Sequence, residues 1–194
     1  MKTKIVIFAC LLIPIALFSF QCARNSGDSA MTKVQRGEYL VNLGGCNDCH
    51  SPKVMTETGP VPDETRLLSG HPADEEIAEI PPDLFSPGGW FTVSNGHFTA
   101  WAGPWGVSFA ANLTPDEVTG IGAWTEESFI QALRTGKHLG TGRAILPPMP
   151  WLPIGKCTDE DLSAIFAYLQ SIPPIENMVP APIPPPGQQT PTAE

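Results

Sequence analysis

The motif Cys46-Asn47-Asp48-Cys49-His50 limits what this chain can fold around more than any other feature of its sequence. Two cysteines separated by two residues and followed directly by a histidine form the C-x-x-C-H pattern of covalent c-type haem attachment. On one turn each thiol can reach one vinyl group of a porphyrin, and the adjacent imidazole is held beneath the iron as its proximal ligand. The pattern occurs once, so the sequence predicts one haem c held by Cys46, Cys49 and His50.

Two other uses of paired cysteines fit the sequence less well. A thioredoxin-like redox pair needs a βαβ context, and no alternation of strands with helices is visible. A structural zinc site needs a second pair of ligands, whereas the next cysteine along the chain, Cys157, stands alone. Haem attachment therefore remains the interpretation of the motif.

Residues 1–21 have the features of a secretory signal, with a basic start and an apolar run that a proline interrupts. The end of this segment resembles a loose bacterial lipobox, with Cys22 as the lipidated first residue of the mature chain and residues 22–31 as a polar tether. Cleavage of an ordinary signal near residues 26–30 is the alternative. We expect an exported protein on the periplasmic side of a bacterial membrane, attached through a lipid anchor on Cys22.

The chain is acidic, with a formal net charge of −9, which becomes −11 when residues 1–21 and their two lysines are removed. Nucleic acid is therefore excluded as a partner, because nonspecific affinity for it comes mainly from Lys and Arg neutralising phosphates. Eight acidic residues crowd the stretch 57–83, where Arg66 is the only Lys or Arg; they could steer a basic partner or simply solvate a loop. They are Glu57, Asp63, Glu64, Asp74, Glu75, Glu76, Glu79 and Asp83.

Three segments carry helix signals. Residues 32–43 begin with a capping box, and residues 125–135 are followed by Gly136 as a C-terminal cap. Residues 158–169 start with a capping threonine and three acidic residues, then place apolar residues at i, i+3, i+4 and i+7. The sequence therefore predicts a few helices within one domain, residues 32–172.

Regular structure is harder to find outside these segments. Residues 51–110 contain turn signals but no sustained period of 2 or 3.6, so we expect a loop-rich insertion. Loops of that length are uncommon in a compact domain unless something such as a large bound cofactor organises them. Residues 173–194 are rich in proline and predict an extended tail, either a strap on the domain or a ligand for a proline-binding partner.

At this point the sequence resembles the class I c-type cytochromes, over residues 32–50 and 111–172. The resemblance implies an all-α fold, the class I cytochrome c fold, with a few helices around one covalently bound haem. It also implies that an aromatic residue of the last helix packs across a glycine of the first helix, here Tyr168 over Gly37. Further segments are similar to the cytochrome subunits of periplasmic dehydrogenases, which often carry several haems, whereas this chain has one C-x-x-C-H. These segments are residues 112–116, 119–124, 132–136 and 146–151.

Met149 is the candidate for the sixth ligand of the iron. It precedes the last helix, and three prolines (Pro147, Pro148 and Pro150) restrict the backbone around it, so little freedom is lost on binding. Core filling is the alternative role for this methionine. His/Met ligation would raise the reduction potential relative to two histidines. The rival imidazole ligands are His71, His97 and His138.

Two groups of side chains have weaker expectations. Arg134, Lys137 and Arg143 form the most basic stretch, in which one arginine pairs with a haem propionate or all are solvated. Trp124 and Trp151 lie in the segments that resemble the family and are expected near the porphyrin.

The sequence thus predicts a periplasmic or membrane-tethered electron carrier that passes one electron at a time and is not an enzyme. Its expected partners are redox proteins: a dehydrogenase, a quinol-oxidising complex or a terminal oxidase. One alternative is a fixed electron-entry subunit of a dehydrogenase or oxidase complex. The other is a haem enzyme or gas sensor in which the sixth site of the iron stays open.

Overall fold

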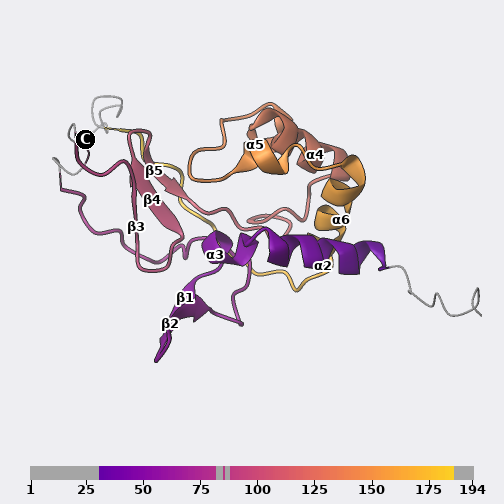
Figure 1. Cartoon of the computed structure of the whole chain (residues 1–194), viewed down its shortest axis with the longest axis horizontal. Helices are drawn as coiled ribbons and strands as arrows, with labels where there is room; N and C mark the ends of the chain where they lie inside the picture. The colour runs from indigo at the N-terminus through magenta and orange to yellow at the C-terminus, as the bar shows by residue number, and fades with distance from the viewer. Residues whose placement is uncertain (1–30, 82–84, 86–87, 186–194) are drawn as a thin grey trace, which may run out of the picture. The chain divides into compact units, whose positions relative to one another are not determined.

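The computed structural model of the chain describes residues 31–81, 85 and 88–185 (Figure 1). The predicted signal, Cys22 with most of its tether, and residues 186–194 of the tail lie outside the described residues. A compact unit begins at Thr32 and contains every helix and strand that the structure describes. Among the described helices, none is both long enough and apolar enough to cross a membrane.

The central helix pair is formed by α2 (Lys33–Leu43) and α6 (Asp159–Leu169). The two helices approach closely at Gly37, where an added Cβ would overlap the carbonyl oxygen of Ala164 and lie 2.7 Å from the Cβ of Tyr168. A side chain at this position would force the helices apart. The expected contact of Gly37 with Tyr168 is present at the Cβ of the tyrosine, and the Ala164 carbonyl shares it.

The helices predicted from the sequence are present with their predicted caps. The side chain of Thr32 and the side chain of Gln35 cap each other's backbone N–H, which completes the capping box of α2. Gly136 closes α4 (Glu126–Thr135) in the left-handed conformation, with φ of 66°. Three shorter helices complete the set: α3 (Cys46–His50), η1 (His138–Gly140) and α5 (Trp151–Ile154).

Five short strands lie in the segment that the sequence predicts as loop-rich. The first two form an antiparallel hairpin, and the other three form an antiparallel sheet in the order β3-β4-β5. The strands are β1 (Lys53–Thr56), β2 (Gly59–Pro62), β3 (Val93–Ser94), β4 (Ala100–Gly103) and β5 (Gly106–Phe109). Strands of two to four residues are too short to show a period of 2, so the sequence analysis missed them. The all-α expectation thus omits this part of the chain.

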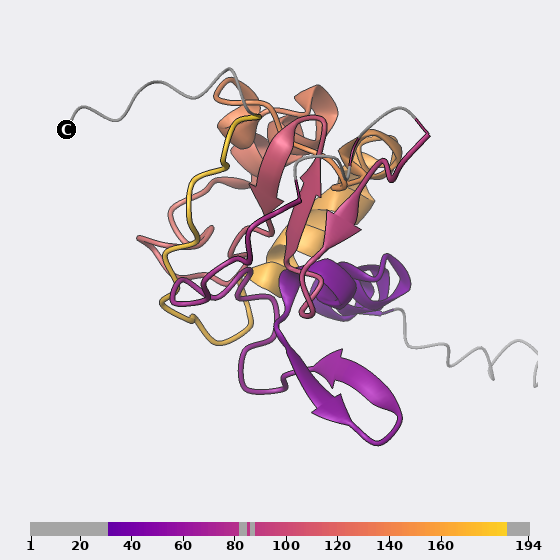
Figure 2. The ribbon, with the colours of Figure 1, turned by 90° about the vertical axis from the view of Figure 1, so that its left-hand side faces the viewer.

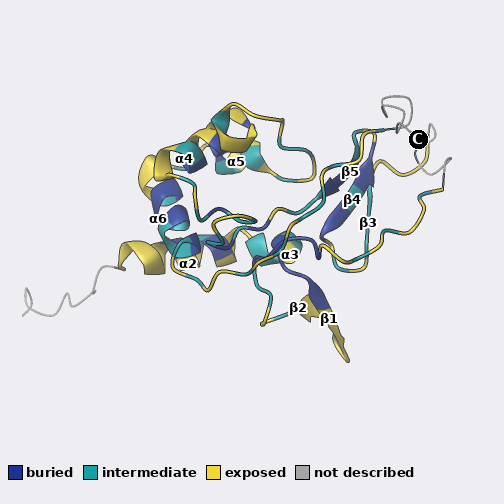
Figure 3. Ribbon diagram, turned by 180° about the vertical axis from the view of Figure 1, so that it is seen from behind, coloured by how far each residue is buried: buried dark blue, intermediate teal, exposed yellow. Residues whose placement is uncertain are grey.

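The hydrophobic core joins α2, α4 and α6, and the buried residues follow the facing sides of these helices (Figure 3). Phe129 of α4 and Phe166 of α6 pack with ring centroids 5.2 Å apart. Leu68 brings the segment after the hairpin into the same core, with 1% of its surface exposed. Complete burial of a large apolar side chain contributes about 1.5–3 kcal/mol, so Leu68 anchors this segment firmly.

Residues 172–185 form a C-terminal strap that runs along the body of the unit, shown in yellow in Figure 2. The Asn177 side chain donates to the carbonyls of Ser69 and His71, at 2.7 and 2.8 Å, and accepts from the Ala73 N–H at 2.9 Å. Further along, the strap pairs with β5 through two backbone hydrogen bonds of 2.8 and 2.9 Å. The strap therefore fixes the position of residues 69–73.

Candidate haem-attachment site

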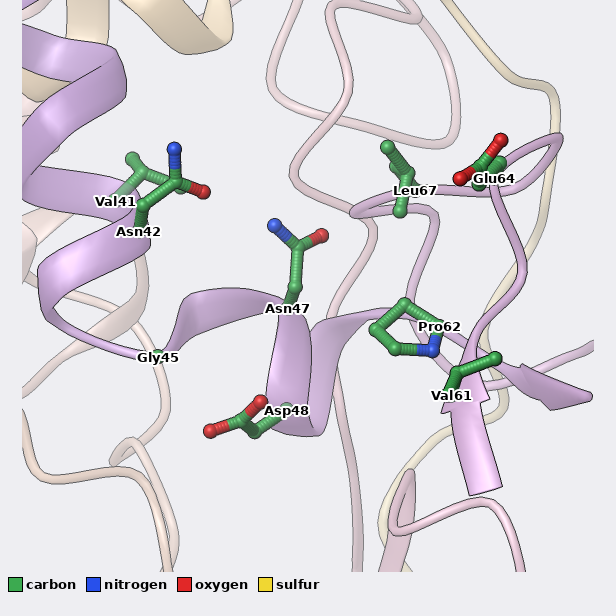
Figure 4. A pocket seen from close by; sticks show the side chains of 9 residues that line it. All are labelled: Val41, Asn42, Gly45, Asn47, Asp48, Val61, Pro62, Glu64 and Leu67. Atoms are coloured by element: carbon green, nitrogen blue, oxygen red, sulfur yellow. The ribbon is translucent and has the colours of Figure 1, made fainter. Parts of the chain in front are cut away.

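The short helix α3 carries the C-x-x-C-H motif. Cys46, Cys49 and His50 are spaced i, i+3 and i+4, so they share one face of this helix. Asn47 and Asp48 lie on the other face, where they line a hollow of about 550 Å³ together with residues of α2 and β2 (Figure 4). Neither thiol nor the imidazole lines that hollow, so it is not the place for a group bound to the motif.

His50 is held in the form that binds a metal. Its side chain is buried, and its Nδ1 lies 2.8 Å from the carbonyl oxygen of Ala111. Because a carbonyl can only accept, Nδ1 carries the proton and donates it, which leaves the lone pair on Nε2. Burial lowers the pKa of His50 and so keeps the ring neutral. An imidazole oriented by an Nδ1–H hydrogen bond to a carbonyl is the usual arrangement of a histidine ligand.

The two thiols are half-buried and unpaired in the structure. Burial raises the pKa of both Cys46 and Cys49. A redox-active C-x-x-C pair depends on a lowered thiol pKa, so the site does not resemble one. Within the described residues, no three His, Cys, Asp or Glu side chains are grouped so that they could hold a metal ion. Two thiols and one imidazole are the donors that attach a haem, whose porphyrin supplies four nitrogen ligands to the iron, whereas a structural zinc site takes four protein ligands.

Met149 is half-buried and packs against the same core cluster as Cys46. It follows the cis Pro147–Pro148 bond and precedes Pro150, the N-cap of α5. The Ser108 hydroxyl of β5 donates to the Pro147 carbonyl at 2.5 Å and so ties this loop to the sheet. The core thus brings together the segments that contain Cys46 and Met149, far apart in the sequence.

Two of the rival histidines lie between the hairpin and β4: His71 precedes the sheet, and His97 lies in the connection from β3 to β4. The fully buried His71 places Nδ1 at 2.9 Å from the Thr99 hydroxyl. The Nδ1 of His97 accepts from the Lys53 backbone N–H at 2.9 Å, so the neutral ring carries its proton on Nε2 and has no lone pair there. In this tautomer His97 is a poor metal ligand.

The third rival, His138, packs edge-on against Trp124, with ring centroids 4.9 Å apart. Trp151 covers Gly136, where a Cβ would lie within 2.6 Å of the indole ring. Both tryptophans border the hydrophobic core. Their expected proximity to a porphyrin stays a prediction.

Of the three residues in the basic stretch, Arg134 forms an ion pair within the described part of the chain. The Arg134 guanidinium donates to the Gly155 carbonyl and forms an ion pair of 2.6 Å with Asp159. This contact ties α4 to the start of α6, so Arg134 is already engaged within the protein. Arg143 and Lys137 form no ion pair within the described part of the chain and are exposed.

Lys53 is a site residue that sequence reasoning missed. Its side chain is buried at the end of α3, where Nζ donates to the carbonyls of Asn47 at 3.0 Å and Ser51 at 2.5 Å. A lysine just after a helix is a known cap of free carbonyls, and that signal could have found it. The Ala111 carbonyl was also missed, because a backbone group leaves no mark in the sequence.

Several similar proteins are cytochrome subunits of dehydrogenases, although no family model matches the chain. The chain is 30% identical to the gluconate 2-dehydrogenase cytochrome c subunit of Pantoea cypripedii, over 70% of this chain and 22% of that protein. It is 26% identical to the cytochrome c subunit of the quinone alcohol dehydrogenase of Gluconobacter oxydans, over 75% of this chain and 23% of that subunit. It is 36% identical to the fructose dehydrogenase cytochrome subunit of Gluconobacter japonicus, over 37% of this chain and 15% of that subunit.

The match covers less than a quarter of the length of each of these relatives. All three relatives are named as cytochrome subunits of dehydrogenases. The site of this chain has the two thiols and the imidazole that attach a haem. Together they support placing the chain in a cytochrome c family.

Proposed function

We propose that this chain transfers single electrons as the haem-carrying cytochrome c subunit of a dehydrogenase. The observation that carries the proposal is the orientation of His50, whose Nδ1–H bond to Ala111 leaves Nε2 free on the face of α3 that also bears both thiols. The similarity to cytochrome subunits of gluconate, alcohol and fructose dehydrogenases supports the same function. It also favours a subunit over a freely diffusing carrier.

The finer proposal is a single haem c, with thioether bonds to Cys46 and Cys49 and with His50 and Met149 as axial ligands. The bound haem supplies one-electron oxidation and reduction of its iron. The chain itself would attach the group, hold His50 in one tautomer, and pack Cys46 and Met149 against the apolar core of α2, α4 and α6. We assign no conversion of a substrate to these residues.

Spectra of the haem-loaded protein test this assignment. We expect about one haem per chain and a near-infrared methionine-to-iron charge-transfer band in the oxidised protein. Met149→Ala should abolish the band, whereas Met55→Ala, at a methionine that is 77% exposed on the hairpin, should leave it unchanged. A band that survives in Met149→Ala would exclude this methionine as the ligand.

An open sixth site makes a different prediction. Carbon monoxide should bind poorly to the reduced protein if Met149 occupies the site, and tightly if the protein is a haem enzyme or gas sensor. Purification without crosslinking distinguishes the remaining possibilities, since a subunit should retain a dehydrogenase and a mobile carrier should elute alone. The partner could also be a quinol-oxidising complex or a terminal oxidase, and the proteins retained would identify it.

Export and lipid attachment complete the proposal. We propose that residues 1–21 are removed and that Cys22 anchors the mature chain at the periplasmic side of a bacterial membrane. Mass spectrometry of the mature N-terminus should then find a diacylated or triacylated Cys22. An unmodified start near residues 26–30 would instead indicate an ordinary signal peptide.

A further inference from the structure

Lys53 places a buried positive charge beside the haem-attachment helix. The side chain is 8% exposed, and among the described residues it forms no ion pair. Its Nζ donates instead to two backbone carbonyls, those of Asn47 and Ser51. Burying an ammonium group without a paired carboxylate is costly, so such a group is rarely present without a role.

Lys53 is fixed at both ends. Its backbone N–H donates to His97, and its Nζ reaches back to the last turn of α3. Helix carbonyls at a C-terminus carry partial negative charge, which makes them good acceptors for an ammonium group. A side chain held in this way has a defined position relative to His50, three residues earlier in the chain.

The charge of Asp48 compensates that of Lys53 only in part. Burial lowers the pKa of Lys53, and the charge of Asp48 opposes that lowering. Asp48 is exposed, so water screens its charge, whereas the buried ammonium is screened much less. The local field at α3 therefore keeps a net positive contribution from Lys53.

We propose that Lys53 is a positioning residue that closes the C-terminal end of α3 and whose charge raises the reduction potential of the attached haem. The inference rests on the proposed function, since it requires a haem on Cys46 and Cys49. Reduction lowers the charge at the iron by one unit, and a fixed positive charge close by favours the less positive state. Loss of this charge should therefore make the haem harder to reduce.

Potentiometric titration of the haem-loaded, full-length protein tests the proposal with three variants. Lys53→Met removes the charge and both hydrogen bonds, and Lys53→Gln removes the charge but keeps an N–H donor. Lys156→Met is the matched control, because it removes the same charge from an exposed lysine with no ion pair among the described residues. We expect a lower potential in both Lys53 variants and little change in the control.

The outcomes separate this inference from the proposed function. The haem content of each protein is measured first by its pyridine haemochrome spectrum, and a wild-type protein without haem would overturn the proposed function itself. If haem is bound but Lys53→Gln keeps the wild-type potential, the charge of Lys53 has no effect on the iron and the inference is wrong. Should Lys53→Met not accumulate, Lys53→Gln alone decides the question. An equal decrease of the reduction potential in Lys156→Met would also overturn the inference, because the effect would then not be specific to Lys53.

Discussion

At the scale of single residues, His71 is the most unusual side chain outside the attachment site. It is fully buried, yet its Nε2 has no hydrogen-bond partner in the described part of the chain. The same holds for Oε2 of Glu75, which lies 4.0 Å from Nδ1 of His71 and 3.8 Å from Nε2 of His97. The His71 ring is enclosed with no hydrogen-bond partner on Nε2, so protonation of His71 is linked to folding.

The linkage predicts how stability changes with pH. Burial lowers the pKa of His71 below its ordinary value of 6.5, although Glu75 opposes this shift. Above that value the ring is neutral in the folded and unfolded chain, and it contributes no pH dependence. Below it the unfolded chain takes up a proton that the folded chain resists, so the free energy of unfolding decreases as the pH falls.

Urea unfolding from about pH 7 to about pH 5 measures this decrease. We expect His71→Asn to show a smaller loss of stability over that range than the wild type, whatever its stability at neutral pH. The comparison of the two slopes removes the contribution of His138, whose pKa is also lowered by burial. If the free energy of unfolding falls equally with pH in both proteins, His71 is not the group that takes up a proton on unfolding.

The residues of the site differ in how far a sequence could predict them. The thiols and His50 follow from a motif whose spacing reflects the chemistry of attachment. The contact of Gly37 with Tyr168 follows from the resemblance, and the structure contains it. The capping role of Lys53 has a local signal, a lysine just after a helix, although its burial has none. The role of the Ala111 carbonyl depends on which segments meet in space, so no local pattern indicates it.

At the scale of elements, predictability follows length and capping. The helices α2, α4 and α6 span ten or eleven residues and carry explicit end signals, so the sequence indicates them well. The strands span two to four residues, at most two cycles of the period of 2, and tertiary pairing decides their positions. The strap has no periodic signal, because its hydrogen bonds use backbone N–H and carbonyl groups and the side chain of one asparagine.

That asparagine yields a prediction for the strap. Asn177→Ala removes three hydrogen bonds that fix residues 69–73 and leaves the Ser69 and His71 carbonyls without this donor. We expect a loss of about 1–3 kcal/mol in the free energy of unfolding. Glu176→Ala, at an exposed neighbour, is the control and should change stability by less than about 0.5 kcal/mol. Equal stability of the two variants would mean that the strap is not held by Asn177.

At the scale of the whole molecule, charge should govern which redox reagents approach the protein. The formal charge is −9, so cations are attracted and anions repelled over distances of about a Debye length. We expect oxidation of the reduced protein by a cationic cobalt complex to slow as salt is added. Oxidation by anionic ferricyanide should accelerate under the same conditions. If the oxidation rates with both reagents are independent of salt concentration, the acidic residues lie far from the point where the electron leaves the protein.

The strap also imposes an order on the assembly of the protein. Asn177 and His71 are 106 residues apart, and closing so long a loop is a late event in folding. In the proposed export, which starts from the N-terminal signal, α3 and its thiols emerge before Asn177. The neighbouring Gly70, whose N–H bonds to the His50 carbonyl at 2.7 Å, is therefore left unclamped until the strap arrives. Export from the N-terminus would thus give the thiols a period of access before the strap fixes residues 69–73.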